Sequence, residues 1–194
     1  MKVICGLSAI LTQDEACWLL QQPDTREPNG VRDFLLIRMM LNYGLRVYEL
    51  TEIRWGDVDL HSKRIIVEKS RGGKRRALSL NNTDIVLFEK WFNALNYKLN
   101  GNSFLFSTPN GKQLSGQYII NVLKRYGKRA ILQRQITPSL LRHTFAINCF
   151  KDSEDIRLVQ RKLGHSNIET TKNYLQTYNM PKKPVKLNIT NLGQ

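Results

Sequence analysis

The sequence predicts an α+β fold that is mostly α-helical and contains a small antiparallel β-sheet or hairpin. Over most of its 194 residues, apolar side chains recur at the spacing of amphipathic helices. Around residues 64–80 the period changes, because a β-branched run and an alternating run flank the turn-forming pair Gly72-Gly73. The length suits one domain, and no linker interrupts residues 11–178. We therefore expect a lead at 1–10, one domain at 11–178 and a tail at 179–194.

Local signals place the individual elements in chain order. Thr12 and Glu15 form a capping box that opens the first helix. Two prolines and a glycine indicate a loop over 22–30, and Gly44 ends the second helix. The expected helices span about 12–22, 31–42, 47–55, 83–95, 116–130, 138–150, 154–162 and 167–177, the strands span 64–68 and 76–80, and a short apolar element occupies 103–107.

The charge balance indicates a polyanionic partner. Thirty Lys and Arg residues face sixteen Asp and Glu residues, which gives a formal net charge of +14. The basic residues are distributed along the whole chain and do not form only a basic tail. This composition favours nucleic acid over an anionic membrane surface, and over a protein that is basic without a polyanionic partner.

Cysteine and histidine usage gives no metal-binding pattern. The three cysteines and three histidines are scattered without the spacing of a zinc site. We therefore expect no metal and no cofactor. An odd number of cysteines, without a secretory leader or a membrane-spanning stretch, predicts free thiols in a reducing compartment. These features predict a cytoplasmic, nucleoid-associated protein without a membrane partner.

Four residues in distinctive surroundings carry the candidate chemistry. Arg46 follows a glycine break in YGLRVYEL, Arg142 lies one turn into a helix opened by Pro138, and His165 precedes Tyr174 by nine residues. Two arginines can hold the non-bridging oxygens of a phosphodiester and stabilise its transition state. A tyrosine hydroxyl can attack phosphorus, and a histidine can orient the oxyanion or move a proton. Such a site requires no metal.

These residues resemble the catalytic domain of the tyrosine recombinases, the phage integrase and Xer-type group. The resemblance covers 11–178 and rests on YGLRVYEL (43–50), KSRGGKRRALSL (69–80), TPSLLRHTF (137–145) and LGHSNIETTKNY (163–174), in this order. It implies that Arg46 and Arg142 bind phosphate, that His165 assists them, and that Tyr174 is the nucleophile. Glu49 matches an acidic residue that supports the site.

The resemblance also implies an activity and partners. Tyr174 would join a 3′ phosphate of double-stranded DNA, free a 5′ hydroxyl and later be displaced by a 5′ hydroxyl from a partner strand. Four copies would assemble on two DNA sites, with the segment 179–194 exchanged between protomers. We expect no N-terminal helical domain of the kind that family members carry, because the chain is either a fragment or one of the short recombinases without that domain. A prokaryote or its mobile element is the expected source.

The sequence departs from the family pattern at two positions. Ser139 stands where the second motif usually carries a histidine, which predicts reduced or altered activity. Arg71 stands where the hairpin usually carries a lysine, and an arginine does not readily give up a proton. Lys69 is our preferred proton donor to the leaving 5′ oxygen, with Lys74 as the alternative. The other basic hairpin residues are expected to bind DNA, namely Arg71, Lys74, Arg75 and Arg76.

Several neighbouring residues have simpler interpretations. His143 adjoins Arg142 and points about 100° away from it on a helix, so we interpret it as a structural or supporting residue. Tyr178 is the rival nucleophile to Tyr174. Ser166 is the expected N-cap of the last helix, which would begin near His165.

Three functions are compatible with the sequence. The first is a site-specific recombinase or integrase that cleaves and rejoins DNA through a 3′-phosphotyrosine. The second is a DNA-binding relative with weakened or lost catalysis. The departures from the family pattern at Ser139 and Arg71 support this second function. The third is a type IB topoisomerase-like enzyme that relaxes DNA with the same chemistry. The integrase-like motifs favour the first.

Overall fold

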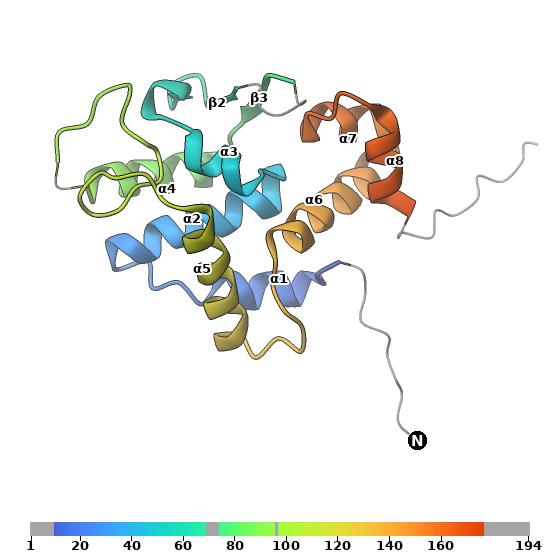
Figure 1. Ribbon diagram of the computed structural model, residues 1–194, viewed down its shortest axis with the longest axis horizontal. Helices are drawn as coiled ribbons and strands as arrows, with labels where there is room; N and C mark the ends of the chain where they lie inside the picture. Colours follow the sequence, from blue (N-terminus) through green and yellow to red (C-terminus); the bar gives the residue numbers. More distant parts are fainter. Residues whose placement is uncertain (1–9, 69–73, 96, 177–194) are drawn as a thin grey trace, which may run out of the picture.

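The computed structural model describes residues 10–68, 74–95 and 97–176. Within these residues the chain is mostly helical with one small antiparallel sheet, as predicted (Figure 1). The predicted Gly72-Gly73 turn, Lys69, Arg71 and nearly all of the predicted lead and tail lie outside them. The helices are α1 (Gln13–Leu20), α2 (Pro28–Tyr43), α3 (Val47–Glu52), the 3-10 helix η1 (Trp55–Asp57), α4 (Asn82–Asn93), α5 (Gly116–Arg129), α6 (Pro138–Ser153), α7 (Ile156–Leu163) and α8 (Ile168–Gln176).

The sheet has three antiparallel strands in the order β1 (Val58–Asp59), β2 (Arg64–Val67) and β3 (Arg76–Ser79). Strands β2 and β3 form the predicted hairpin, with Arg64 opposite Ser79 and Val67 opposite Arg76. The sequence did not predict β1, because a strand of two residues is too short to show an alternating pattern.

Two helix boundaries differ from the prediction for local reasons. Helix α2 begins at Pro28, inside the expected loop, because a proline is well accommodated in the first turn of a helix. Helix α3 ends at Glu52, and residues Trp55–Asp57 form η1 instead of extending it. The predicted short element at 103–107 contributes two isolated bridges, between Phe104 and Arg54 and between Ser107 and Gln113, instead of a strand.

Helix α2 forms the centre of the core. Its side chains Leu35, Leu36, Ile37, Met39 and Met40 are completely buried. Helices α4 and α6 pack on it, and α1 and α5 make further contacts. Burial on nearly all sides explains why α2 is apolar around most of its circumference and gives only a weak amphipathic signal.

A buried carboxylate ties α4 to α2. Asp84 caps the backbone of Asn81 in the first turn of α4, and it accepts hydrogen bonds from the side chains of Arg38 and Tyr43. Burial and the neighbouring Asp84 carboxylate raise the pKa of Tyr43 far above its usual range. This arrangement satisfies a charge that would be costly to bury alone.

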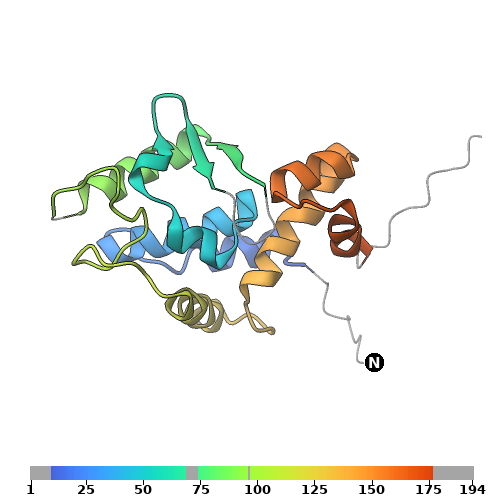
Figure 2. The same ribbon diagram turned by 45° about the horizontal axis from the view of Figure 1, so that its top comes forward.

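The two sides of the candidate site come from distant parts of the sequence. Figures 1 and 2 show α3 and the sheet on one side, and α6, α7 and α8 on the other. Helix α6 packs on α2 and also carries α7 and α8, while α7 contacts β3. The central pair α2 and α6 therefore sets how the two sides face each other.

Gly44 makes the junction between α2 and α3 possible. Its backbone is left-handed, with φ of 64°, and its carbonyl accepts a hydrogen bond from Arg142. A Cβ atom at Gly44 would lie 2.4 Å from Cδ1 of Phe145 and 2.9 Å from Cδ2 of Leu163. The turn that leads into Arg46 therefore has room only for glycine.

We expect Gly44→Ala to lower the free energy of unfolding by at least about 2 kcal/mol, because it combines left-handed strain with overpacking. Urea unfolding monitored by circular dichroism measures this. Gly101→Ala is the matched control, since the nearest atom to its Cβ would be 3.8 Å away, and we expect a change within about 0.5 kcal/mol. Equal effects of the two substitutions would contradict the argument.

Candidate active site

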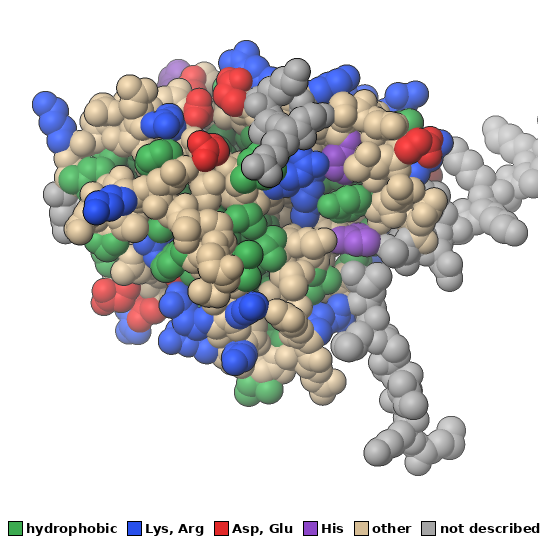
Figure 3. Space-filling view, in the orientation of Figure 1, with side chains coloured by type: hydrophobic (Ala, Val, Ile, Leu, Met, Phe, Trp, Pro, Cys, Tyr) green, Lys and Arg blue, Asp and Glu red, His purple; other side chains and the backbone are tan. Residues whose placement is uncertain are grey.

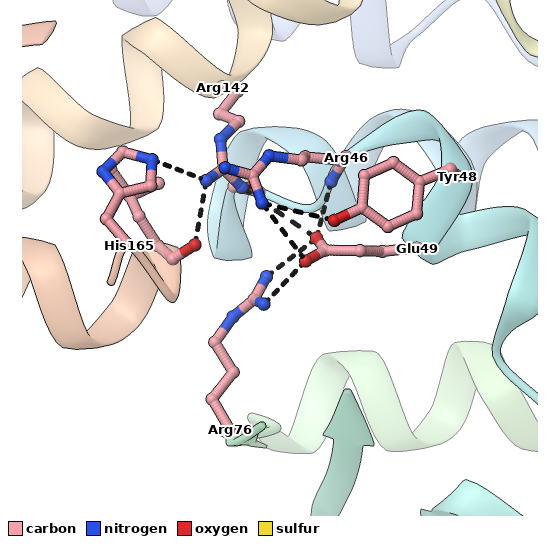
Figure 4. A network of polar contacts seen from close by, with 8 residues as sticks. Arg46, Tyr48, Glu49, Arg76, Arg142 and His165 are labelled. Atoms are coloured by element: carbon pink, nitrogen blue, oxygen red, sulfur yellow. Dashed lines mark hydrogen bonds and ion pairs between the residues drawn. The ribbon is translucent and has the colours of Figure 1, made fainter. Parts of the chain in front are cut away.

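Arg46 is the N-cap residue of α3, directly before the helix that the sequence predicted from residue 47. Its backbone N–H donates to Oε2 of Glu49 at 2.8 Å, which fixes the start of the helix. Its guanidinium remains about 30% exposed and lies 3.3 Å from the hydroxyl of Tyr48 and 4.0 Å from Oε1 of Glu49 (Figure 4). Arg46 therefore presents a positioned cation that solvent or a ligand can reach.

Arg142 is buried in the second turn of α6, and its side chain joins three segments. Nη1 donates to the carbonyl of Gly44, and Nη2 donates to the carbonyl of Leu163 at 2.8 Å. Nη2 also lies 3.0 Å from Nε2 of His165. Burial and then the charge of Arg46 lower the pKa of Arg142 to about 10, against the influence of Glu49 and Tyr174. The guanidinium therefore stays protonated at neutral pH.

The carboxylate of Glu49 lies close to three arginine side chains. Arg76 donates two hydrogen bonds to this carboxylate, at 2.7 and 2.8 Å, and Arg142 lies 3.9 Å from Oε2 (Figure 4). Burial is the largest influence on Glu49 and opposes its ionisation. The hydrogen bonds and charge of Arg76 and the N–H of Arg46 outweigh it, so the pKa lies below its ordinary value.

Arg76 occupies a different place from the one the sequence indicated. We expected it among the hairpin residues that face DNA, but its side chain is only 8% exposed and is bound to Glu49. By contrast, Arg75 is exposed and pairs with Glu68 at 2.8 Å. Arg76 is therefore placed as a residue that holds the site together. The period-2 alternation of β3 gave the signal, since Arg75 and Arg76 must point to opposite faces.

His165 lies in the turn between α7 and α8 and is buried. Its Nε2 faces a guanidinium that can only donate, so Nε2 accepts and Nδ1–H donates to Oγ1 of Thr171 at 3.0 Å. Burial, followed by the charges of Arg142, Arg46 and Arg76, lowers the pKa of His165 to about 4. The imidazole is therefore neutral at physiological pH.

The cap of α8 differs from the prediction. Asn167, and not Ser166, accepts a hydrogen bond from the backbone N–H of Glu169 at 2.9 Å, directly before the helix begins at Ile168. Both residues are good N-caps. His165 takes part in the preceding turn, where its N–H donates to the carbonyl of Gln160. This keeps the imidazole between the two helices.

Tyr174 is half-buried on α8 and lies beside His165. The two ring centroids are 5.4 Å apart, and Tyr174 also packs against the apolar cluster that contains Phe145 and Leu163. The fold therefore brings Arg46, Arg142, His165 and Tyr174 into one region, although they come from α3, α6, the α7–α8 turn and α8. The rival Tyr178 lies outside the described residues.

Two further candidate residues, Ser139 and Lys74, are exposed to solvent, and Lys69 lies outside the described residues. Ser139 is exposed in the first turn of α6. The side chain of Lys74 is exposed as well, while its backbone N–H donates to the carbonyl of Gly164 at 3.2 Å. This bond holds the base of the hairpin against the α7–α8 turn.

A basic groove leads away from His165. It has a volume of about 490 Å³ and lies between the end of the hairpin and α7. Figure 3 shows Lys and Arg side chains close to histidine side chains on one face. The sequence analysis did not single out the basic residues of α7 or Tyr48. The spacing of Arg157 and Arg161, one turn apart, was the available signal. The groove is lined by Lys74, Arg75, Arg157, Arg161, Lys162 and His165, among others.

The described residues hold no cluster of three or more His, Cys, Asp or Glu side chains suited to a metal ion. None of the helices within them is long and apolar enough to cross a lipid bilayer.

Comparisons with known proteins identify relatives of this chain. The model of the phage integrase family matches residues 9–180. Tyrosine recombinase XerD of Listeria monocytogenes serotype 4b is 33% identical over 184 residues, which cover 93% of this chain and 62% of that protein. Tyrosine recombinase XerC of Pelotomaculum thermopropionicum is 32% identical over 175 residues, covering 87% of this chain and 57% of that protein.

Solved structures show the same fold. The crystal structure of XerA recombinase matches with a TM-score of 0.75 and 26% identity, over 89% of this chain and 60% of that one. The XerH site-specific recombinase bound to difH substrate matches with a TM-score of 0.72 and 28% identity, over 87% and 50% of the two chains. The chain thus spans about half to two thirds of the length of these proteins.

The lowered pKa of His165 predicts a loss of stability in mild acid. Between about pH 6.5 and its folded-state pKa of about 4, the unfolded chain binds a proton at His165 that the folded chain does not. Stability therefore falls as pH falls through this window. Each pKa unit corresponds to about 1.4 kcal/mol, so His165 should contribute a loss of about 2 kcal/mol between about pH 7 and about pH 5.

Urea unfolding at a series of pH values tests this contribution. We expect His165→Asn to reduce the pH dependence by about 2 kcal/mol. His61→Asn, at an exposed residue of the turn between β1 and β2, should leave the wild-type dependence in place. The same pH dependence in wild type and His165→Asn would show that the buried imidazole does not act in this way.

Proposed function

Since this chain belongs to the phage integrase family, we propose that it is the catalytic part of a site-specific recombinase that cleaves and rejoins DNA through a 3′-phosphotyrosine. The observation that carries the proposal is the convergence of Arg46, Arg142 and His165 beside Tyr174. The XerH relative, described as a site-specific recombinase, was solved with its difH substrate. That likeness supports double-stranded DNA as the substrate here.

The two arginines are assigned to the phosphate. Arg46 is partly exposed, whereas Arg142 is anchored by two backbone carbonyls, so one is accessible and the other rigidly placed. The buried Nε of Arg142 has no hydrogen-bond partner within the described residues. A buried donor without a partner is costly, and a non-bridging phosphate oxygen would satisfy it. Together the two cations would offset the charge that develops in the transition state.

Tyr174 is assigned as the nucleophile. Its hydroxyl oxygen forms a bond to phosphorus, the bond from phosphorus to the 5′ oxygen breaks, and the 3′ phosphate stays on the tyrosine. The phenol loses a proton and the 5′ oxygen gains one. The proton donor is assigned to the hairpin, with Lys69 preferred and Lys74 as the alternative. Reversal by a 5′ hydroxyl of another strand rejoins DNA and conserves the bond energy.

The basic groove is assigned to the DNA backbone beyond the cleaved phosphate. Lys74, Arg75, Arg157, Arg161 and Lys162 line it next to His165. Arg71 of the hairpin is assigned to the same interface, while Arg76 acts from beneath through Glu49. We further propose that four copies assemble on two DNA sites, with residues 179–194 contacting a neighbouring protomer, at the nucleoid in a bacterial cytoplasm.

One observation favours a second candidate, a DNA-binding relative with weakened catalysis. Ser139 is exposed and replaces the histidine that the family motif usually supplies. A serine hydroxyl can donate a hydrogen bond to phosphate, but it is a poor acid or base near neutral pH. The covalent-adduct experiment below separates the two candidates.

We expect the protein to form a covalent adduct with a nicked suicide DNA that carries its site. The adduct should resist denaturing electrophoresis and disappear in Tyr174→Phe, because only a phenol can form the ester. Tyr178→Phe is the matched control and should retain the adduct. If the adduct disappeared in Tyr178→Phe and persisted in Tyr174→Phe, the nucleophile would be Tyr178. Absence of any adduct with intact DNA binding would favour the second candidate.

We also expect the groove to contribute to the salt dependence of DNA binding. Arg161→Ala should weaken binding and lower the slope of log K against log salt by about 1, because it removes one phosphate contact. Fluorescence anisotropy at several salt concentrations measures this slope. Lys90→Ala, at an exposed residue of α4 outside the groove, is the control and should keep the wild-type slope. Identical slopes for both variants would show that Arg161 does not contact the DNA phosphates.

A further inference from the structure

Helix α6 carries a histidine that the proposed mechanism leaves without a role. His143 follows Arg142 directly, so the two side chains leave the helix about 100° apart. Arg142 turns toward Gly44 and Leu163, whereas His143 meets α8. The ring centroids of His143 and Tyr174 are 5.5 Å apart, with an angle of 46° between the ring planes. This separation falls within the range of attractive aromatic contacts.

A polar contact accompanies the ring contact. His143 forms a hydrogen bond with the backbone of Tyr174 that raises the pKa of His143. A bond with this effect is one that the imidazole donates, so its acceptor is a backbone carbonyl. His143 therefore contacts both the backbone and the ring of Tyr174.

Tyr174 is in this way held by two imidazoles from different elements. His165 contacts the ring from the α7–α8 turn at 5.4 Å, and His143 contacts it from α6. His165 is itself fixed by Arg142 and Thr171. The contact from α6 thus links the nucleophile directly to the helix that carries a phosphate-binding arginine.

We propose that His143 is a positioning residue for Tyr174, which holds the backbone and ring of the tyrosine so that its hydroxyl points toward the phosphate site. The proposal rests on the proposed function. Burial lowers the pKa of His143 below its ordinary value and outweighs the hydrogen bond to Tyr174. The imidazole is therefore neutral at physiological pH, and it can donate one N–H without adding a further cation to a site that already holds three arginines.

The face of α6 gives this role additional weight. Ser139 and His143 are four residues apart and so lie on the same side of the helix. Ser139 offers no imidazole there, and His143 is the only histidine in α6. Helix α6 therefore has one imidazole that can donate a hydrogen bond to the backbone of Tyr174.

The test compares His143→Ala, His143→Asn and wild type in single-turnover adduct formation on the suicide DNA. We expect His143→Ala to slow the reaction by about 10–100-fold, because a displaced nucleophile loses its alignment. DNA affinity should change by less than about twofold, since Arg46 and Arg142 are untouched. His143→Asn retains an N–H donor and should recover part of the rate. Asn148→Ala, at an exposed residue of the same helix, is the control and should react like wild type.

A substrate with sulfur in place of the 5′ bridging oxygen separates positioning from acid catalysis. Thiolate leaves without protonation, so the variant would recover wild-type speed if His143 served the leaving group. We expect the full defect to persist. Recovery on the sulfur substrate, or an adduct rate within twofold of wild type on the ordinary substrate, would overturn the proposal.

Hydrogen exchange without DNA tests the same inference independently of activity. We expect the amides of α8 to exchange faster in His143→Ala than in wild type, and at wild-type rates in Asn148→Ala. Unchanged protection of α8 would overturn the positioning role even if the protein cleaves DNA. If wild type forms no adduct, the proposed function fails, and the exchange result alone decides about His143. Should His143→Ala not fold, His143→Asn serves for both measurements.

Discussion

The buried carboxylate of Glu49 is the interaction on which the rest of the site depends. Arg46, Arg76 and Arg142 all lie within 4.0 Å of it. Three guanidinium groups confined to one region would repel one another strongly in a low-dielectric environment. Glu49 offsets this repulsion, and each arginine comes from a different element. Removing one partner of a buried pair typically costs about 3–5 kcal/mol, so the carboxylate is structural as well as electrostatic.

The same cluster determines the state of the histidines. With three cations and one anion nearby, a charged imidazole at His165 would add further repulsion, and its pKa is accordingly lowered to about 4. Burial acts in the same direction on His143. The site therefore concentrates positive charge on arginines, which keep their protons, and uses histidines as neutral hydrogen-bonding groups. A phosphodiester entering this region meets fixed cations with little reorganisation, which is the arrangement that stabilises a transition state well.

The sequence predicted the main helices and the β2–β3 pair, and its motifs singled out Arg46, Arg142, His165 and Tyr174, but it predicted neither β1 nor the contacts within the site. Arg46 and Arg142 lie at the predicted points of their helices, because a glycine break and a proline at the first turn are strong local signals. The direction of the Arg76 side chain depends on how β3 packs relative to α3, which is a feature of the tertiary structure. Asn167 rather than Ser166 caps α8, since adjacent good caps cannot be distinguished from composition alone. His143 was interpreted as a supporting residue, yet its contact with Tyr174 depends on how α6 and α8 pack.

Gly164 connects the base of the hairpin to the turn that carries His165. Its carbonyl accepts a hydrogen bond from the N–H of Lys74, and a Cβ atom there would lie 2.9 Å from Nη1 of Arg76. The left-handed backbone of Gly164, with φ of 69°, ends α7 one residue before His165. Movement at the base of the hairpin would therefore reach Glu49 through Arg76 and His165 through the adjacent backbone. Because Tyr174 packs on that histidine, the geometry couples the segment assigned to the proton donor with the residue assigned to the attack. In the proposed function, the leaving oxygen and the attacking hydroxyl would both be positioned through this connected set of contacts.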